Sequence, residues 1–258
     1  MALNKILAIA NPTQAEQPAI ERALDTARIT GAQVHVYCCV ESEENTDQIQ
    51  RLLDKISSAS GGEGLQVDNE IEVSPDWRGS VVGVASRYGA DMVFKHSITH
   101  TDVDREKRTT ADWNLLRTAP CPVLMVKDFN QWQGRKILAA ITPLSTDEGH
   151  QRLNAKIISF ARRFADAYGS DAHFVTAFQD RNHEPSSAEL AHLCGVSEDH
   201  VHIVENNAVD GITDCASQLN TDLIIIGTVA RSGIKARVVG NTSERLLDHT
   251  ESDILVLN

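Results

Sequence analysis

The chain has 258 residues, of which 41% are hydrophobic, and a formal net charge of −12. This length is large for one domain and suits two domains of about 130 residues, each with its own core. An acidic surface disfavours general affinity for DNA, RNA or anionic membranes, because all three require concentrated positive charge. No apolar stretch approaches the ~20 residues that span a bilayer. We see no export signal and expect a cytoplasmic protein with neither a nucleic-acid nor a membrane partner.

The first half is expected to alternate short strands with helices. The stretches between its apolar runs have helical spacing, as in Ile20, Ala23 and Leu24. Five cysteines, an odd number without zinc-finger spacing, are interpreted as reduced thiols, with Cys38 and Cys39 in the core. The predicted strands of this half are the apolar runs 5–10, 33–40, 65–73, 91–94 and 122–126.

The second half shows the same alternation of strands and helices. Its predicted strands are 136–141, 171–178, 200–204, 222–226 and 253–257. The long first helix carries an apolar stripe formed by Ile157, Ala161, Phe164, Ala165 and Tyr168. Short apolar strands separated by helices predict a parallel sheet that is covered on both faces. Such a sheet binds ligands at the carboxyl ends of its strands, near the switch in strand order.

The two halves match each other at an offset of 131 residues. Lys5–Ala8 falls on Lys136–Ala139 and Asp91 falls on Asp222, whereas Gly31 matches Gly169 at an offset of 138. The second half therefore has a longer first crossover and a correspondingly shorter second one. Two copies of one fold are expected to keep strands in register while helices and loops change length. We predict domains at 1–128 and 134–258, with superposable backbones.

A glycine-rich segment follows the fourth strand of the second half. Gly227 leaves the strand, Gly233 interrupts the loop, and Gly240 precedes a predicted helix. Glycine lets backbone amides approach a ligand closely. A helix that begins near Asn241 offers free N–H groups and a positive dipole end, which suit a phosphate.

The charges of this segment agree with an anion site. Three cations and no acid lie between 227 and 240, namely Arg231, Lys235 and Arg237. The alternative is purely structural, because Asn241 and Glu244 form an ordinary capping-box pattern and glycines are common in such loops. Spacing alone leaves both explanations open.

The segment 222–257 resembles the C-terminal part of universal stress proteins. ATP-binding members of that family carry Gly-x2-Gly-x9-Gly-Ser/Thr at this position. Gly227 and Gly240 occupy the outer glycine positions, whereas Ala230 replaces the middle glycine and Asn241 replaces the Ser/Thr. Thr242 and Ser243 follow and offer further hydroxyls.

The strand-1 ends and the first half depart further from this pattern. Nucleotide-binding members tend to have an Asp at the end of strand 1, where this chain has Asn11 and Thr142. In the first half His96 stands at the position of Gly227, and the loop 96–109 mixes three acids with three cations. A phosphate cradle is therefore not expected there. The stretch 91–127 resembles the N-terminal half of the tandem, E-type universal stress proteins.

The resemblance implies a fold and an assembly. Each half would be a five-stranded parallel sheet sandwiched by helices, Rossmann-like and similar to the adenine nucleotide alpha hydrolases. The halves would pack as a pseudo-dimer through their last strands, 122–126 and 253–257. Because exposed apolar edge strands invite pairing, whole chains are also expected to self-associate as a homodimer, a pseudo-tetramer of domains.

The leading functional hypothesis is a universal stress response protein that binds a small phosphate-bearing or other anionic ligand. Binding is assigned mainly to the second domain, with little or no catalysis and no certain cofactor. ATP or another nucleotide is expected at most as a weak ligand, because the motif departs at two positions. The candidate ligand-binding residues are Thr142, Gly227, Thr228, Arg231, Gly233, Gly240, Asn241, Thr242 and Ser243.

Two other functions stay open. An ATP-binding protein with slow hydrolysis or phosphotransfer would need a Mg²⁺ ligand and a positioned attacking group, and the sequence nominates neither. A structural, partner-binding protein would have two decayed pockets. No catalytic residue is assigned.

The histidines are not assigned to a metal or to a sensor. His96 and His100 are four residues apart, but they lie in a predicted loop without an evident third ligand. His183, His192, His200 and His202 are interpreted as surface and edge positions rather than as a pH sensor.

Overall fold

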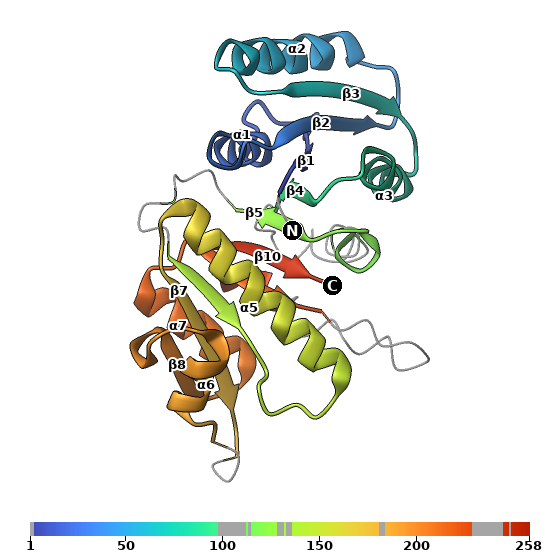
Figure 1. Cartoon of the computed structure of the whole chain (residues 1–258). Helices are drawn as coiled ribbons and strands as arrows, with labels where there is room; N and C mark the ends of the chain where they lie inside the picture. The colour runs from blue at the N-terminus through green and yellow to red at the C-terminus, as the bar shows by residue number, and fades with distance from the viewer. Residues whose placement is uncertain are drawn as a thin grey trace. The chain divides into compact units, whose positions relative to one another are not determined.

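A computed structural model describes residues 3–97, 112, 115–127, 132, 136–180, 184–228, 245–247 and 249–258. The chain divides into two compact units (Figure 1). Unit 1 is Met1–Phe129 and unit 2 is Asn130–Asn258.

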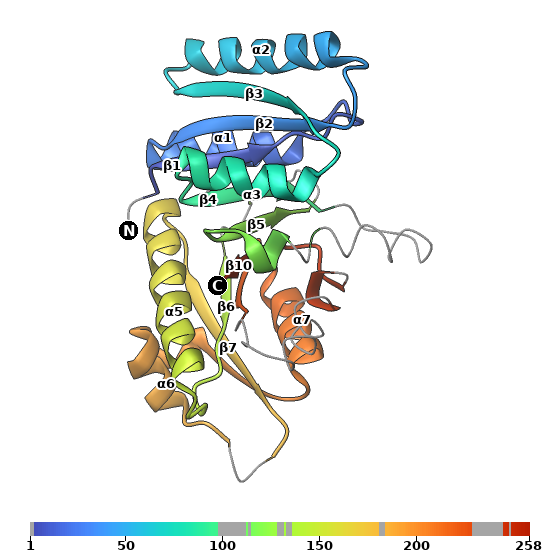
Figure 2. The same ribbon diagram turned by 90° about the vertical axis from the view of Figure 1, so that its right-hand side faces the viewer.

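Unit 1 is a five-stranded, fully parallel sheet with the strand order β3-β2-β1-β4-β5. Helices α1 and α3 lie on opposite faces of this sheet (Figures 1 and 2). This arrangement confirms the predicted architecture of the first half. Its elements are β1 (Lys5–Ile9), α1 (Pro18–Thr30), β2 (Gln33–Val40), α2 (Thr46–Gly62), β3 (Val67–Val73), α3 (Trp77–Tyr88), β4 (Met92–His96) and β5 (Val123–Val126).

Unit 2 repeats the same topology, with the order β10-β9-β6-β7-β8 and parallel pairing throughout. Helices α5 and α7 cover opposite faces of its sheet (Figure 2). Its elements are β6 (Ile137–Ala140), α5 (Glu148–Tyr168), β7 (Ala172–Phe178), α6 (Ser187–Cys194), the short 3-10 helix η2 (Glu198–His200), β8 (Val201–Glu205), α7 (Ala208–Leu219), β9 (Leu223–Gly227) and β10 (Asp253–Leu257).

The central strands are buried on both faces, as continuous apolar runs require. All five residues of β10 and the first four of β9 are buried. The predicted stripe of α5 is buried from Ile157 to Tyr168. The five cysteines are free, and Cys38 and Cys39 are buried, which confirms the interpretation as core thiols.

The first helices of the two units differ in length at their amino ends. Helix α5 has 21 residues and α1 has 13, and each is followed by a left-handed glycine, Gly169 and Gly31. The eight additional residues therefore lie at the amino end of α5, near the carboxyl ends of β6 and β9. Helix α6 is shorter than α2, with 8 residues against 17. The compensating length changes predicted from the repeat are confirmed.

Candidate functional site

The strand order of unit 2 reverses between β6 and β9, and this is where a parallel sheet of this kind opens for a ligand. Thr142 follows β6, Gly227 ends β9, and Thr228 comes next. The register of the pair sets Ala139 opposite Ile225, and three residues further on it brings Thr142 level with Thr228. The structure thus brings together three of the predicted ligand-binding residues.

The remaining predicted ligand-binding residues lie outside the described part of the chain. They are Arg231, Gly233, Gly240, Asn241, Thr242 and Ser243. The described part of the site therefore consists of the strand ends and the helix that packs beside them.

The backbone of Thr142 is held by a buried carboxamide from α5. Asn154 donates from Nδ2 to the Thr142 carbonyl oxygen at 2.9 Å, and its Oδ1 accepts from the Thr142 amide at 3.1 Å. An amide side chain matches a peptide group in this way because it carries one donor and one acceptor. Both contacts use the Thr142 backbone, and the Thr142 residue itself is exposed. The clamp fixes the strand end through backbone atoms alone.

Unit 1 holds its first strand end in the same way with a residue from a different place. Gln17 donates from Nε2 to the Asn11 carbonyl oxygen and accepts from the Asn11 amide at Oε1, both at 2.8 Å. Gln17 is the residue before α1, whereas Asn154 lies in the second turn of α5. Each unit therefore places a neutral carboxamide against the end of its first strand, at Asn11 and at Thr142. Nucleotide-binding members of the family that the sequence resembles tend to have an Asp at this position.

Gly227 is required by packing. A Cβ at this position would overlap the Leu153 side chain, which belongs to the additional turns of α5. The φ angle of Gly227 is not positive, so its backbone conformation does not by itself require a glycine. Packing against Leu153 is thus a reason for this glycine besides the predicted close approach of a ligand, which stays a prediction.

The corresponding position of unit 1 carries an imidazole. His96 Nδ1 lies 3.1 Å from Gln14 Oε1. Beside it, the Lys95 ammonium pairs with Asp112 at 2.8 Å, and both side chains are mostly buried. The cation at this edge of unit 1 is thus neutralised by a carboxylate. The prediction that the first half forms no phosphate cradle concerns the loop 96–109, most of which lies outside the described residues.

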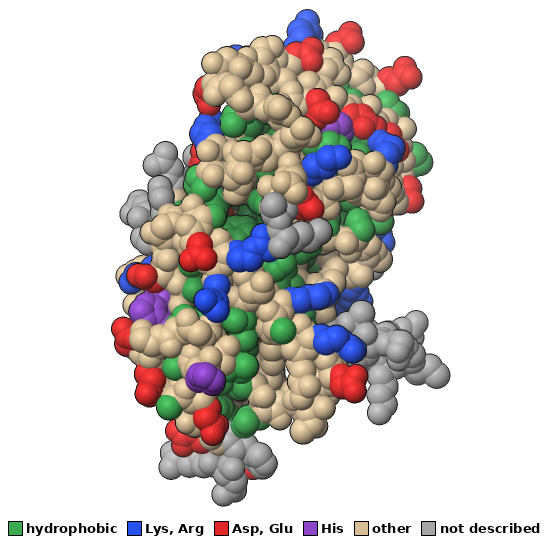
Figure 3. Space-filling view, in the orientation of Figure 1, with side chains coloured by type: hydrophobic (Ala, Val, Ile, Leu, Met, Phe, Trp, Pro, Cys, Tyr) green, Lys and Arg blue, Asp and Glu red, His purple; other side chains and the backbone are tan. Residues whose placement is uncertain are grey.

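In unit 2 a lysine approaches the same edge. Lys156 donates from Nζ to the Asn258 carbonyl oxygen at 2.9 Å, and Thr228 donates from Oγ1 to Asn258 Oδ1 at 3.0 Å. The ammonium therefore lies beside the end of β10, which neighbours β9. Figure 3 shows acidic side chains together with several Lys and Arg side chains on the face that it draws.

Four residues of this edge were missed by the sequence analysis, namely Leu153, Asn154, Lys156 and Asn258. Asn154 had a detectable signal, because an Asn in the apolar stripe of a helix needs a polar partner when it is buried. The other three had none, since their roles depend on the packing of α5 against strands that are distant in sequence.

Within the described ranges, no group of three or more His, Cys, Asp or Glu residues is arranged to hold a metal ion. His100, the second member of the pair rejected as a chelate, lies outside those ranges. No helix in the described part of the chain is long and apolar enough to cross a membrane.

Comparison with known proteins points to one family. The model of the universal stress protein family matches residues 3–127 and 152–258. Universal stress protein E of Escherichia coli K12 is 25% identical, over 98% of this chain and 93% of that protein. A crystal structure of a protein of unknown function from Pseudomonas aeruginosa PAO1 is 30% identical, with a TM-score of 0.82 over 99% of this chain and 92% of that one. A universal stress protein from Archaeoglobus fulgidus shares the fold, with a TM-score of 0.75, 13% identity, and coverage of 99% and 96%.

Proposed function

Because the chain belongs to the universal stress protein family, we propose that it is a cytoplasmic stress-response protein that binds a small anionic ligand through unit 2. Catalysis is little or none in this proposal. The difference between the switch points of the two units supports anion binding by unit 2. Unit 1 places His96 and a Lys95 paired with Asp112 at this edge, whereas unit 2 has the exposed Thr142 together with Thr228 and Lys156, which both donate to Asn258 rather than to a carboxylate side chain.

The chemistry of these groups favours an anion. A hydroxyl and an ammonium both donate hydrogen bonds, and charge-assisted bonds to an anion are the stronger kind. Exposed cations contribute modestly in salt, so affinity would depend on how many donors converge. The donors of the segment 229–244 would complete the site, with the ligand between Gly227 and the stretch Asn241–Ser243.

The acid nearest to Thr142 in sequence after β6 is unsuited to general base catalysis. Asp147 caps α5 by accepting from the His150 amide at 3.0 Å, and its Oδ1 lies 3.0 Å from His150 Nδ1. These hydrogen bonds with His150 lower the pKa of the Asp147 carboxyl. A carboxylate with a lowered pKa is a weak base, and this one is already occupied as a cap.

Self-association is part of the proposal. The chain would form a homodimer, which is a pseudo-tetramer of domains. Light scattering at micromolar concentration should then give about twice the monomer mass of 28.3 kDa. A strict monomer would contradict this part and leave ligand binding untouched.

Two matched variants test ligand binding. Native mass spectrometry of the purified full-length chain would identify a retained small anion, and calorimetry would compare Thr142→Val with Thr13→Val. Both threonines are exposed at the carboxyl edge, one in each unit. Losing one hydrogen bond of about 1 kcal/mol weakens binding about fivefold to tenfold. We expect that loss for Thr142→Val only.

The other outcomes separate the alternatives. Steady release of phosphate from ATP and Mg²⁺ would favour slow hydrolysis over pure binding. Absence of any retained or added anion would favour the structural, partner-binding role. Equal weakening by both variants would show that the anion does not bind at the unit 2 switch point.

A further inference from the structure

Three histidines meet at the amino end of β7 and β8 in unit 2. His173 lies on β7 and is buried, with 9% of its surface exposed. Its Nδ1 is 3.1 Å from Nε2 of His202 on β8, and its ring stacks on His200 with centroids 4.6 Å apart. Two of these histidines were interpreted from the sequence as separate surface and edge positions. The fold gathers them around a third, at the end of the sheet opposite to the ligand edge.

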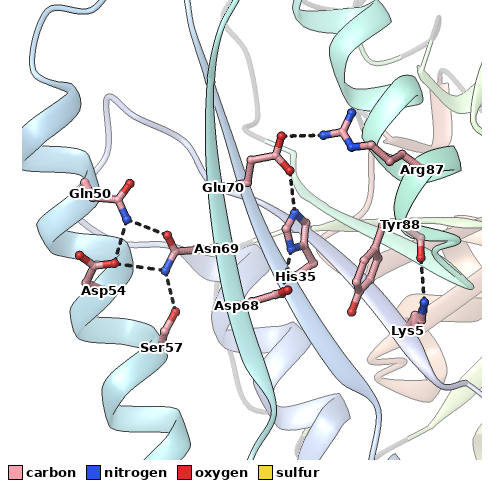
Figure 4. Close-up of polar contacts among 10 residues, drawn as sticks. All are labelled: Lys5, His35, Gln50, Asp54, Ser57, Asp68, Asn69, Glu70, Arg87 and Tyr88. Carbon is pink, nitrogen blue, oxygen red and sulfur yellow. Dashed lines mark hydrogen bonds and ion pairs between the residues drawn. The ribbon is translucent and has the colours of Figure 1, made fainter.

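Unit 1 has a histidine at the same place with opposite surroundings (Figure 4). His35 on β2 is buried, its Nδ1 is 2.8 Å from Asp68 Oδ1, and its Nε2 is 3.3 Å from Glu70 Oε2. Tyr88 stacks on the His35 ring at 4.9 Å, and Arg87 pairs with the second oxygen of Glu70 at 2.6 Å. The imidazole thus lies between two carboxylates.

The strand registers show that these surroundings are equivalent positions. His35 pairs with Asp68 across β2 and β3. In unit 2 Phe174 pairs with Val201 across β7 and β8, which sets His173 opposite His200. His200 and His202 therefore stand where unit 1 has Asp68 and Glu70. One fold surrounds the same buried histidine with two acids in one copy and with two histidines in the other.

The two arrangements differ in the hydrogen-bond partners that they offer the buried ring. A carboxylate only accepts, so both nitrogens of His35 face acceptors. The contact between His173 and His202 needs one N–H donor and one unprotonated nitrogen. Protonating both rings leaves two N–H groups facing each other and adds two like charges.

One exposed carboxylate touches the cluster, since Asp199 Oδ1 lies 3.3 Å from His200 Nδ1, whereas the contact between His173 and His202 joins two imidazole rings. Burial is the largest effect and lowers the pKa of His173 to about 4, with His200 and His202 next; Lys136 also lowers it, and Asp171 opposes them. Burial, followed by His200, lowers the pKa of His202. On α7, which packs on β7, Asp210 and Asp214 are exposed. Cys215 on the same helix is buried, and burial raises its pKa to about 11, so the thiol stays neutral in acid.

We infer that His173, His200 and His202 form an acid-sensitive switch, in which protonation breaks the contact between His173 and His202 and loosens η2 and β8. Strand β8 is the edge strand of unit 2, so it can open while β6, β9 and β10 stay paired with one another. The three residues lie away from Thr142 and Thr228, so the acid response is separate from the proposed ligand site.

The sign and size of the response follow from proton linkage. A histidine in an opened segment has a pKa near 6.5, whereas that of His173 is about 4. Between these values the open state binds more protons, so the closed state is fully stable above pH 6.5 and loses stability as the pH falls. At pH 5.5 the linkage of His173 alone shifts the opening equilibrium by roughly tenfold.

Hydrogen exchange of the full chain at pH 7.5 and 5.5, corrected for the intrinsic rates, measures this opening in both units at once. We expect about tenfold lower protection at pH 5.5 in peptides that cover β7, η2 and β8. Peptides that cover β2 and β3 should show no such loss and act as the internal control. Equal protection of unit 2 at both pH values, or an equal loss in the two units, would overturn the inference.

Exchanging the surroundings between the units sharpens the test. His202→Glu and His200→Asp give unit 2 the carboxylates of unit 1, and each should abolish the tenfold loss. The double variant Asp68→His with Glu70→His makes the full reverse change and should introduce an acid response at β2 and β3. Circular dichroism at pH 7.5 checks that each variant is folded. Should none fold, histidine ring titration of the wild-type chain by NMR decides, and a His173 pKa at or above 6.5 would overturn the inference.

Discussion

Asn154 holds the Thr142 backbone through both atoms of its carboxamide, at 3.1 Å to the amide nitrogen and 2.9 Å to the carbonyl oxygen. The pair joins the additional turns of α5 to the end of β6. It fixes the backbone of the exposed residue Thr142 at the switch point, although the two residues are twelve positions apart in the chain.

Removing this clamp should destabilise unit 2. Asn154→Leu leaves the Thr142 amide and carbonyl without their partner, which costs about 1–3 kcal/mol when the groups stay buried. Urea unfolding of the full chain should show the loss in the transition of unit 2. Ser159→Ala, on the exposed side of the same helix, is the control and should change the free energy of unfolding by less than about 0.5 kcal/mol. Equal effects of the two changes would refute the clamp.

Gly227 and Leu153 should behave as a coupled pair. A Cβ at Gly227 would overlap the Leu153 side chain, and overpacking of this kind costs about 1–3 kcal/mol. Gly227→Ala should therefore lower the unfolding free energy. In the Leu153→Ala background the same change should cost much less, because the obstructing side chain is gone. A double-mutant cycle measures the coupling, and strict additivity would show that the glycine serves another purpose.

ATP should bind weakly or not at all in unit 2, and not in unit 1. Ala230 adds a Cβ at the middle glycine position of the family motif, and Thr142 replaces the Asp. Two lost contacts of at least about 1 kcal/mol each weaken binding by roughly 30-fold or more. Calorimetry with ATP and Mg²⁺ measures the affinity. A dissociation constant in the low micromolar range, abolished by Gly240→Val, would contradict this expectation.

Much of the fold was predictable because its signals are local. Buried strands such as β9 and β10 appear as apolar runs, and helix–loop stretches separate them, so the parallel sheet followed directly. The repeat also predicted that α5 is longer than α1. Lys5 and Lys136 match at an offset of 131 residues, whereas Gly31 and Gly169, which follow the two helices, match at an offset of 138.

The contacts that shape the site were not predictable, because they depend on tertiary placement. Nothing in the sequence around Gly227 reveals that Leu153 lies over it. The meeting of His173 with His200 and His202 depends on the register of β7 with β8. His202 is 29 residues from His173, and only the pairing of the two strands brings their rings into contact.

The most direct measurement of the central claim is an amide NMR titration of the full chain with inorganic phosphate and with ATP. The account predicts shifts at Thr142 and Thr228, on adjacent strand ends of unit 2, and none at Asn11 and Ser97, the corresponding ends in unit 1. Shifts confined to Asn11 and Ser97, or no saturable shifts with either anion, would contradict it.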